Sequence, residues 1–406
     1  MHIRSTKAQA GLALTAVVAV GLISACGSSS SSDTAAEAAT EAATEAATEA
    51  ATDATTEEAA PADSGNQEVT AAQAIVDQYL QAPSTIVQNT PLSGPFPGVG
   101  ATHVFLQCEL PQCKNIGEGV RAADKAVGWI SKTIPYNTAD PATLSSAMIQ
   151  ALDFNPAVVT PTGFPQAVWG SPEILAAYEQ AGAIIVPVSV ANLEISKTVP
   201  GGAATALDYR LGGELIGNWF IADSNAEGHA LVLDVPAYEV MKAHGDSVKA
   251  TVAAGCVACV ITPLDITLPQ LGAGETNPAI VAAIQKEPSI KYVLATNGAF
   301  IGGLRAALDA ADLTDVKIAG GSATINNYQG LIDGTESAWA AEAIFQRGWI
   351  VADIAARALL GMDVPDGDGG GVQMLLTSAN VDNPPTESLD KPADYEAQFK
   401  TLWGLS

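Results

Sequence analysis

The sequence predicts an α/β protein with two similar lobes, each built on a doubly wound parallel sheet. Three observations support this prediction. Short apolar runs recur along the chain, helical patterns separate them, and the part expected to fold spans roughly 300 residues, enough for two lobes of ordinary size. A strand, helix, strand pattern repeated this often is typical of a parallel sheet covered by helices. The number of runs suits two sheets better than one.

The apolar runs predict these buried strands: "THVFLQ", "PAVVTP", "AIIVPVSV", "HALVLDV", "VACVITP", "KYVLAT" and "VKIAGG". Apolar residues at helical spacing lie between them, as at Ile116, Val120, Ala123 and Val127, and at Phe300, Leu304, Ala307 and Leu308. A short helix is also expected over residues 72–81. Because ligands in such sheets bind outside the carboxyl ends of the strands, binding residues should directly follow these runs.

Residues 1–25 have the features of an export signal, because Arg4 and Lys7 precede an apolar stretch over residues 8–22. The following "ISAC" matches the lipobox of bacterial lipoproteins. That match implies lipidation of Cys26, cleavage before it, and anchoring at the outer, extracytoplasmic face of the bacterial cytoplasmic membrane. The alternative is an ordinary secretory signal with an incidental cysteine. A spanning helix is disfavoured because the apolar run is shorter than about 18–20 residues.

Residues 26–70 are rich in Ala, Thr, Ser and acidic residues and contain no Lys or Arg. The repeated "EAAT" places Glu37, Glu41 and Glu45 four residues apart, where like charges repel one another on a helix. We therefore expect a solvated tether. The net charge of −26 comes partly from this segment, but the rest of the chain is also acidic. The absence of a basic patch argues against nucleic acid and anionic lipid surfaces as partners.

Several phrases, in order, resemble the ribose-like, sugar-binding branch of the type I periplasmic binding proteins. They are "QCKNIGEGVRAADKAVGW", "ADPATLSSAMIQALDFNPAVVTPTG", "ILAAYEQAGAIIVPVSV", "EPSIKYVLATNGAFIGGLRAALDAADLTDVKIAGG" and "MLLTSANVDN". The resemblance implies two lobes joined by a three-segment hinge, with crossings near residues 198–206, around Glu342 and near residues 371–373. A ligand would be enclosed in the cleft between the lobes by hinge closure. Transcription regulators of this fold carry a DNA-binding headpiece where this chain has an export signal.

The resemblance also divides the chain. After an N-terminal helix and linker (residues 71–98), lobe 1 comprises residues 99–203 and 343–371. Lobe 2 comprises residues 204–342 and 372–406.

The family's ligand-binding loops map onto nine positions of this sequence, which are Glu109, Gln112, Thr160, Phe164, Ser189, His244, Asn297, Ser322 and Glu342. Arginines that are common in the family at positions 190 and 244 are replaced by Val190 and His244. The expected cleft therefore gains carboxylates and lacks arginine, which disfavours an anionic ligand and favours an amine or a hydroxyl-rich neutral one.

Some of these residues have a plainer interpretation. Asn297 could cap a helix, and His244 could be structural. Glu109 could point to water, and Glu342 could be a solvated hinge residue. Trp169 fits a core role at least as well as a ligand role, and Trp219, on an apolar helical stretch, is expected in the core.

The cysteines other than Cys26 form two close pairs, Cys108 with Cys113 and Cys256 with Cys259. In an exported protein an even number of cysteines predicts disulfides. The second pair precedes a strand and does not open a helix, so it lacks the helix dipole that activates a thiol. A redox pair and a metal site are the alternatives. We expect the first disulfide to rigidify a ligand loop that carries Glu109 and Gln112.

These observations predict a lipid-anchored solute-binding protein that captures a small polar, sugar-like or related ligand and delivers it to the permease of an ABC transporter. A sensory receptor that presents its ligand-bound form to a membrane signalling protein is one alternative, and a thiol-redox lipoprotein is another. The sequence has no H-E-x-x-H or G-x-S-x-G motif, so we expect no enzyme, metal or cofactor. A monomer is expected.

Overall fold

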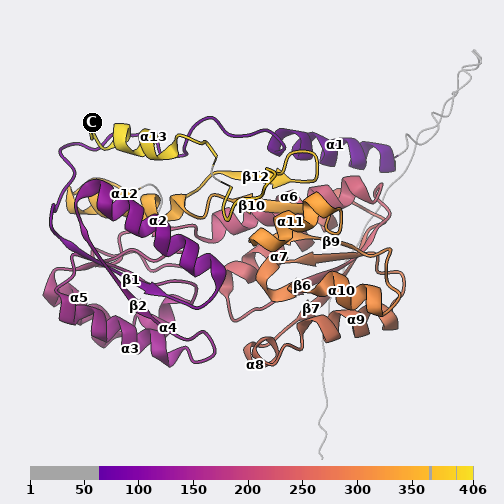
Figure 1. Ribbon diagram of the computed structural model, residues 1–406, viewed down its shortest axis with the longest axis horizontal. Coiled ribbons are helices and arrows are strands. Elements are labelled where there is room, and N and C mark those ends of the chain that lie inside the picture. The colour runs from indigo at the N-terminus through magenta and orange to yellow at the C-terminus, as the bar shows by residue number, and fades with distance from the viewer. Residues whose placement is uncertain (1–63, 365–367, 390, 406) are drawn as a thin grey trace, which may run out of the picture. The chain divides into compact units, whose positions relative to one another are not determined.

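Two sheets, one in each lobe, organise the computed structural model (Figure 1), which describes residues 64–364, 368–389 and 391–405. All of these residues belong to one unit, Ala60–Ser406. The predicted signal peptide, Cys26 and tether residues 26–63 lie outside the described residues. Within the described part, no helix combines the length and apolar character needed to cross a membrane.

Lobe 1 contains a parallel sheet with the strand order β2-β1-β3-β4. Side chains alternate across its central strand, as the two-residue period of a strand requires. Phe105 packs with α2 and α12 (Gln346–Leu359) on one face, whereas Val104 and Leu106 pack with α3 and α5 on the other. In chain order its elements are β1 (Thr102–Gln107), α2 (Pro111–Val127), β2 (Ile130–Pro135), α3 (Ala142–Ala151), η1 (Leu152–Phe154), β3 (Val158–Thr160), α4 (Gln166–Trp169), α5 (Pro172–Ala181) and β4 (Ile184–Ile185).

Lobe 2 contains a larger sheet with the order β12-β10-β9-β8-β6-β7, in which β12 pairs antiparallel with β10 and the other pairs are parallel. Ala230 and Val232 of β6 face α6 and α7, while Leu231 and Leu233 face α9 and α10. Its elements are α6 (Ala206–Asp223), β6 (His229–Asp234), α7 (Glu239–Gly255), β7 (Val260–Asp265), α8 (Leu268–Gly272), α9 (Thr276–Lys286), β8 (Tyr292–Ala295), η2 (Gly298–Ile301), α10 (Leu304–Ala310), β9 (Lys317–Gly321), α11 (Ile325–Asp333), β10 (Ala338–Glu342) and β12 (Gln373–Leu376).

The described chain passes between the lobes at the three places expected. The first follows β5 (Gly202–Ala203), which pairs with β11 (Asp368–Gly369). The second leads from β10 to α12 (Gln346–Leu359), and the third from β11 to β12. α12 packs tightly on α2, where an added Cβ on Gly119 would lie 2.0 Å from the carbonyl oxygen of Phe345. The α/β architecture with parallel sheets predicted from the sequence is therefore confirmed.

The C-terminal segment differs from the predicted division, which placed residues 372–406 in lobe 2. Only its first part, β12, belongs to the lobe 2 sheet. The last helix, α13 (Tyr395–Leu402), packs on α12 of lobe 1, because Phe399 and Trp403 bury their rings against Trp349. The stacked indoles of Trp349 and Trp403 lie 5.3 Å apart.

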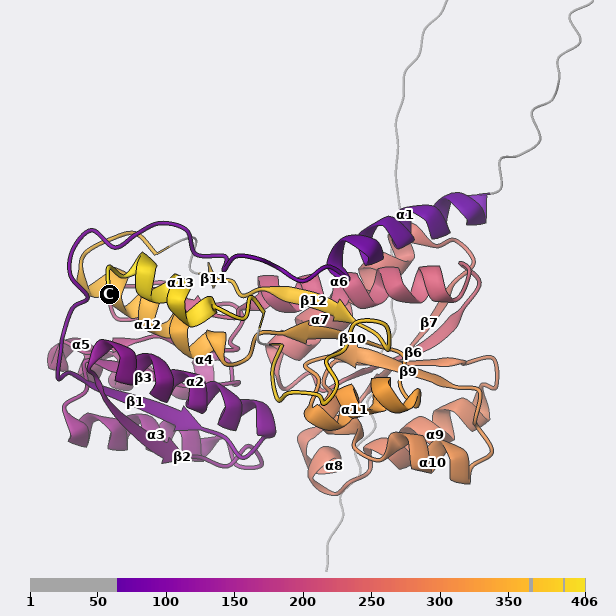
Figure 2. The same ribbon diagram turned by 45° about the horizontal axis from the view of Figure 1, so that its top comes forward.

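The N-terminal helix is longer than predicted. α1 spans Ser64–Tyr79, so residues 64–70, which were assigned to the tether, are helical. Ala72 and Val76 of α1 pack on α6 of lobe 2 (Figure 2), and Glu68 Oε1 accepts a hydrogen bond of 3.2 Å from Val257 N. These contacts hold α1 against lobe 2, and residues 64–70 extend the helix that was expected to begin near residue 72.

Residues 80–98, in the segment between α1 and β1, form what we call the N-terminal strap. Leu80 O accepts a hydrogen bond of 3.0 Å from Asn380 Nδ2, next to the lobe 2 strand β12. Ser84 O accepts one of 3.1 Å from Gln398 Nε2 of α13, on lobe 1. Farther along the strap, Gln88 Nε2 donates a hydrogen bond of 2.9 Å to Gly370 O in the hinge. The strap thus links both lobes along the hinge (Figure 2).

Candidate functional site

A small cavity of about 50 Å³ lies between the lobes, where the carboxyl ends of strands from both sheets meet. Its walls come from the loops that follow β1, β2 and β3 in lobe 1 and β6, β8 and β9 in lobe 2. Lobe 1 contributes Leu110, Gln112, Tyr136, Thr138, Thr162 and Ser189, among others. Lobe 2 contributes Tyr209, Tyr238, Met241, Asn297, Phe300 and Ser322, and α12 adds Arg347. This is the position at which open α/β sheets bind ligands.

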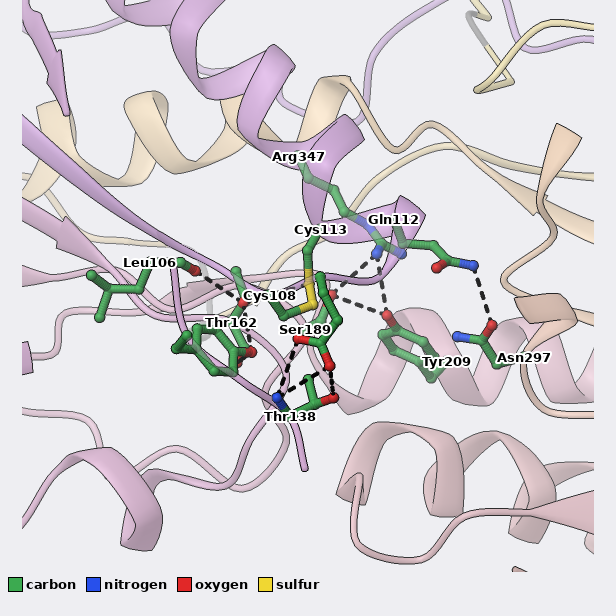
Figure 3. Close-up of a disulfide and its surroundings, with 12 residues drawn as sticks. Leu106, Cys108, Gln112, Cys113, Thr138, Thr162, Ser189, Tyr209, Asn297 and Arg347 are labelled. Carbon is green, nitrogen blue, oxygen red and sulfur yellow. Dashed lines mark hydrogen bonds between the residues drawn. A yellow bond between two sulfur atoms is a disulfide. The ribbon is translucent and has the colours of Figure 1, made fainter. Parts of the chain in front are cut away.

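The loop after β1 is held in shape by the disulfide between Cys108 and Cys113 (Figure 3). Cys108 directly follows β1, and Cys113 lies in the first turn of α2, which begins with Pro111. Pro is favoured there because the first helical N–H has no partner within the helix. The disulfide therefore fixes the first turn of α2 against the end of β1 and so positions Gln112.

Gln112 crosses the cavity from lobe 1 to lobe 2. Its Nε2 donates to Asn297 Oδ1 at 3.2 Å and to the carbonyl oxygen of Ser322 at 3.0 Å (Figure 3 shows the first of these bonds). Asn297 Oδ1 also accepts from Ala299 N at 2.8 Å, so Asn297 caps η2 and faces the cavity at the same time. Three of the nine predicted positions, Gln112, Asn297 and Ser322, are thereby brought together as a contact between the lobes.

An arginine that the sequence analysis did not consider lies at the hinge side of the cavity. Arg347, in the first turn of α12, donates from Nη1 to Ser189 Oγ and to Tyr209 Oη, both at 3.1 Å, and from Nη2 to Glu342 Oε2 (Figure 3 shows the contacts with Ser189 and Tyr209). The expectation of a cleft without arginine is therefore wrong. It failed because only the loop positions known to bind ligands in the family were compared. One sequence signal was available: Arg347 directly precedes the apolar run "GWIVA" of α12, and a charged residue on a buried helix has to be paired.

The two carboxylates expected to face a ligand are both engaged by the protein. Buried Glu342 forms an ion pair with Arg347 and accepts from Ser322 Oγ at 3.3 Å. Burial alone would lower the pKa of Arg347, but the Glu342 carboxylate raises it, so the guanidinium stays charged. Exposed Glu109 accepts hydrogen bonds from Thr138 N and Oγ1 and ties the loop after β1 to the loop after β2. An amine-binding role based on free carboxylates is not supported by this geometry.

The remaining predicted positions lie at different distances from the cavity. Thr160 is buried inside lobe 1, where its Oγ1 lies 2.9 Å from His103 Nε2, and Thr162 lines the cavity in its place. Phe164 stacks beside Tyr238, with ring centroids 5.2 Å apart. His244 is fully enclosed between α6 and β9, and this burial lowers its pKa to about 4. Its imidazole is therefore neutral at pH 7, which fits the structural interpretation.

Ser189 and Ser322 both adopt left-handed backbone conformations, with φ of 57° and 46°. Such conformations are unfavourable for residues other than glycine and cluster at functional sites. Each serine follows the end of a strand region and turns its hydroxyl toward the Arg347 and Glu342 pair. The backbone of both lobes is thus shaped around this buried pair.

A larger groove of about 550 Å³ lies beside α7, lined by Asn192, Arg210, Glu239 and Lys242, among others. It is open to solvent, and its charged groups are partly paired, since Lys242 contacts Asp246 and Asn192 Nδ2 donates to Glu239 Oε2 at 3.2 Å. The enclosed cavity between the sheets is the better candidate because its polar groups converge on one point.

The second disulfide joins Cys256 and Cys259 between the end of α7 and the start of β7. As expected, it lies at the amino end of the strand, away from the cavity. Among the residues described, no cluster of three or more His, Cys, Asp or Glu side chains could hold a metal ion. The two cysteine pairs therefore do not combine into one site.

Comparison with known proteins found no matching family model and no matching curated protein. Solved structures match well. A 5-methylthioribose transporter solute-binding protein from Thermotoga lettingae superposes with a TM-score of 0.61 and 15% identity, covering 78% of this chain and 99% of that chain. A carbohydrate transporter solute-binding protein from Agrobacterium radiobacter, in complex with D-arabinose, superposes with a TM-score of 0.60 and 17% identity, covering 74% of this chain and 99% of that chain. An ABC sugar transporter subunit from Rhodobacter sphaeroides superposes with a TM-score of 0.59 and 17% identity, covering 70% of this chain and 100% of that chain. The chain therefore has the type I periplasmic binding fold.

Proposed function

We propose that the chain is an extracytoplasmic solute-binding lipoprotein. Anchored through Cys26, it captures a small polar solute, sugar-like or related, between its lobes and delivers it to the permease of an ABC importer. The observation that supports this most is the cavity at the carboxyl ends of both sheets, because closing a hinge would enclose a solute there. The neighbours of similar fold, whose names describe transporter solute-binding proteins, add to this support.

Capture requires the lobes to separate. A cavity of about 50 Å³ is far below the roughly 300–1,000 Å³ of ordinary ligand pockets. The side chain of Gln112 lines the cavity and bonds to Asn297 and to the carbonyl oxygen of Ser322 across the cleft. A solute must therefore break this contact and replace it with bonds of its own.

The test is a thermal-shift screen of the purified mature chain against sugars, polyols, amines and amino acids. A bound solute should raise the melting temperature in a concentration-dependent way, because it binds the folded state only. Replacing Asn297 by Ala should remove the shift. The control is Asn218→Ala on α6, since the Asn218 side chain donates to Glu214 O away from the cavity. If Asn297→Ala leaves the shift of every hit intact, the binding site lies elsewhere.

Anchoring and delivery are tested separately. An alkyne analogue of palmitate should label the protein expressed in a bacterial host, and Cys26→Ser should remove the label and release the chain from the membrane fraction. Retained labelling of that variant would contradict the assignment of Cys26. Delivery predicts that the solute-loaded chain, but not the empty one, stimulates ATP hydrolysis by its partner ABC importer reconstituted in liposomes.

A further inference from the structure

A row of aromatic rings runs from one lobe to the other beside the cavity. Tyr136 and Phe164 of lobe 1 have centroids 6.2 Å apart, and Tyr238 and Phe300 of lobe 2 are stacked at 6.0 Å with an interplanar angle of 20°. The contact that joins the two halves is Phe164 with Tyr238, at 5.2 Å. Separating the lobes would therefore uncover an aromatic surface on each side of the cleft.

The rest of the lining is mostly apolar. Leu110 and Ile116 contribute from lobe 1, Val240 and Met241 contribute from lobe 2, and the Cys108 disulfide lies between them. A sugar could still bind such a wall with one face of its ring, but its hydroxyl groups would need hydrogen-bond partners around the edge.

Most polar groups at the cavity already have partners within the protein. The Tyr136 hydroxyl donates to Thr162 O at 2.8 Å, and the Ser322 hydroxyl donates to Glu342 at 3.3 Å. The Ser189 hydroxyl accepts from both Tyr209 and Arg347. These groups cannot turn to a ligand without leaving a buried partner unsatisfied, which is unfavourable.

Spare hydrogen-bonding capacity at the cavity is concentrated on two amides and on the buried hydroxyl of Tyr238. Among the residues that the structure describes, buried Gln112 Oε1 has no hydrogen-bond partner. Among the residues described, Asn297 Nδ2 donates to a weak acceptor, Met241 Sδ, at 3.9 Å. One free acceptor and one under-used donor thus lie side by side, because Gln112 and Asn297 already touch. A carboxamide complements them, since its N–H can donate to Gln112 and its oxygen can accept from Asn297.

We propose that the solute has a planar aromatic or similarly apolar body with one amide-like or hydroxyl end, and that polyhydroxylated sugars are poor ligands. The body lies between the aromatic surfaces of the two lobes, and the polar end replaces the contact between Gln112 and Asn297. This inference rests on the proposed function. It differs from it in the ligand class, which changes from the sugar-like solutes named for proteins of similar fold to a planar, mostly apolar solute.

The experiment compares benzamide with D-arabinose and allitol by isothermal titration calorimetry on the mature chain. Benzamide and D-arabinose have similar numbers of non-hydrogen atoms, so size does not separate them. Benzamide should bind at least about tenfold more tightly than either polyol. Gln112→Leu should weaken benzamide binding at least about tenfold, whereas Gln150→Leu, at an exposed position on α3, should leave it unchanged.

The outcomes separate the two proposals. If D-arabinose or allitol binds and benzamide does not, the ligand class is wrong while solute binding stands. If benzamide binds equally well to Gln112→Leu, it binds outside this cavity and the inference is overturned. If no member of the whole solute panel binds, the proposed function itself fails. Phe300→Leu provides a second variant should Gln112→Leu not fold, and it should weaken benzamide binding with little effect on any polyol binding.

Discussion

The buried ion pair between Glu342 and Arg347 allows a quantitative test of how the hinge is held. Each of these residues is 4% exposed, so removing one partner leaves the other charge buried. Arg347→Met keeps an unbranched apolar stem without the guanidinium and leaves the Glu342 carboxylate with Ser322 Oγ, at 3.3 Å, as its remaining hydrogen-bond donor among the residues described. An uncompensated buried charge of this kind typically costs about 3–5 kcal/mol, which is the loss we expect in the free energy of unfolding.

Glu342→Gln should also destabilise, because the guanidinium then keeps only the hydroxyls of Ser189 and Tyr209. The double variant removes both charges, and replacing a buried pair by uncharged groups is often close to neutral. The double variant should therefore be more stable than Arg347→Met alone, with a coupling energy of at least about 1 kcal/mol.

The assay is urea unfolding at 25 °C and pH 7, followed by far-UV circular dichroism. Lys242→Met is the control, because Lys242 and Asp246 form an exposed pair at positions i and i+4 that should be worth less than about 0.5 kcal/mol. The reasoning would be refuted if the losses of the two single variants simply added in the double variant to within about 0.5 kcal/mol.

Further predictions concern packing and pH. Gly119→Ala should lower the free energy of unfolding by about 1–3 kcal/mol, because its Cβ would lie 2.0 Å from Phe345 O. The control Gly272→Ala, whose Cβ would meet open space, should change stability little. Equal losses in the two variants would contradict close packing of α2 on α12. Burial raises the pKa of Glu336 to about 7, so the folded state holds a proton that the unfolded chain releases, and stability should fall as the pH rises from 4.5 to 7. Glu336→Gln should remove that decrease, and an unchanged pH profile of the urea midpoint would disprove it. Burial lowers the pKa of His244 to about 4, so the unfolded chain binds a proton that the folded state does not, and the free energy of unfolding should fall as the pH falls from 6.5 to 4. In His244→Gln the urea midpoint should depend less on pH over that range.

Most of the strands that the sequence predicted are buried on both faces, so their apolar runs leave little ambiguity; β7 is an edge strand that was found through its short apolar run. β2 was missed because it lies at an edge of its sheet and exposes most of its side chains. β10 was missed because "AWAAE" is rich in alanine, which favours helices, and only its position between β9 and β12 makes it a strand. In both cases tertiary pairing decides what local composition does not.

The candidate site was predictable where a loop follows a recognisable strand, as at Gln112 and Asn297. It was not predictable where the partner comes from a distant segment. Arg347 reaches Ser189 across 158 positions of sequence, and Glu109 turns to Thr138 and away from the cavity. A sequence shows which polar groups are available, but their pairing with one another determines what remains for a ligand.

The N-terminal strap sets a geometric limit on hinge motion. Leu80 is fixed beside β12 in lobe 2 and Ser84 is fixed to α13 on lobe 1, so four Cα–Cα steps connect the two attachment points. Four extended steps span at most about 14 Å. While both attachments hold, the lobes cannot part by more than this distance along the strapped edge. Any wider separation must therefore occur at the opposite edge of the cleft, by rotation of the lobes about the strapped edge.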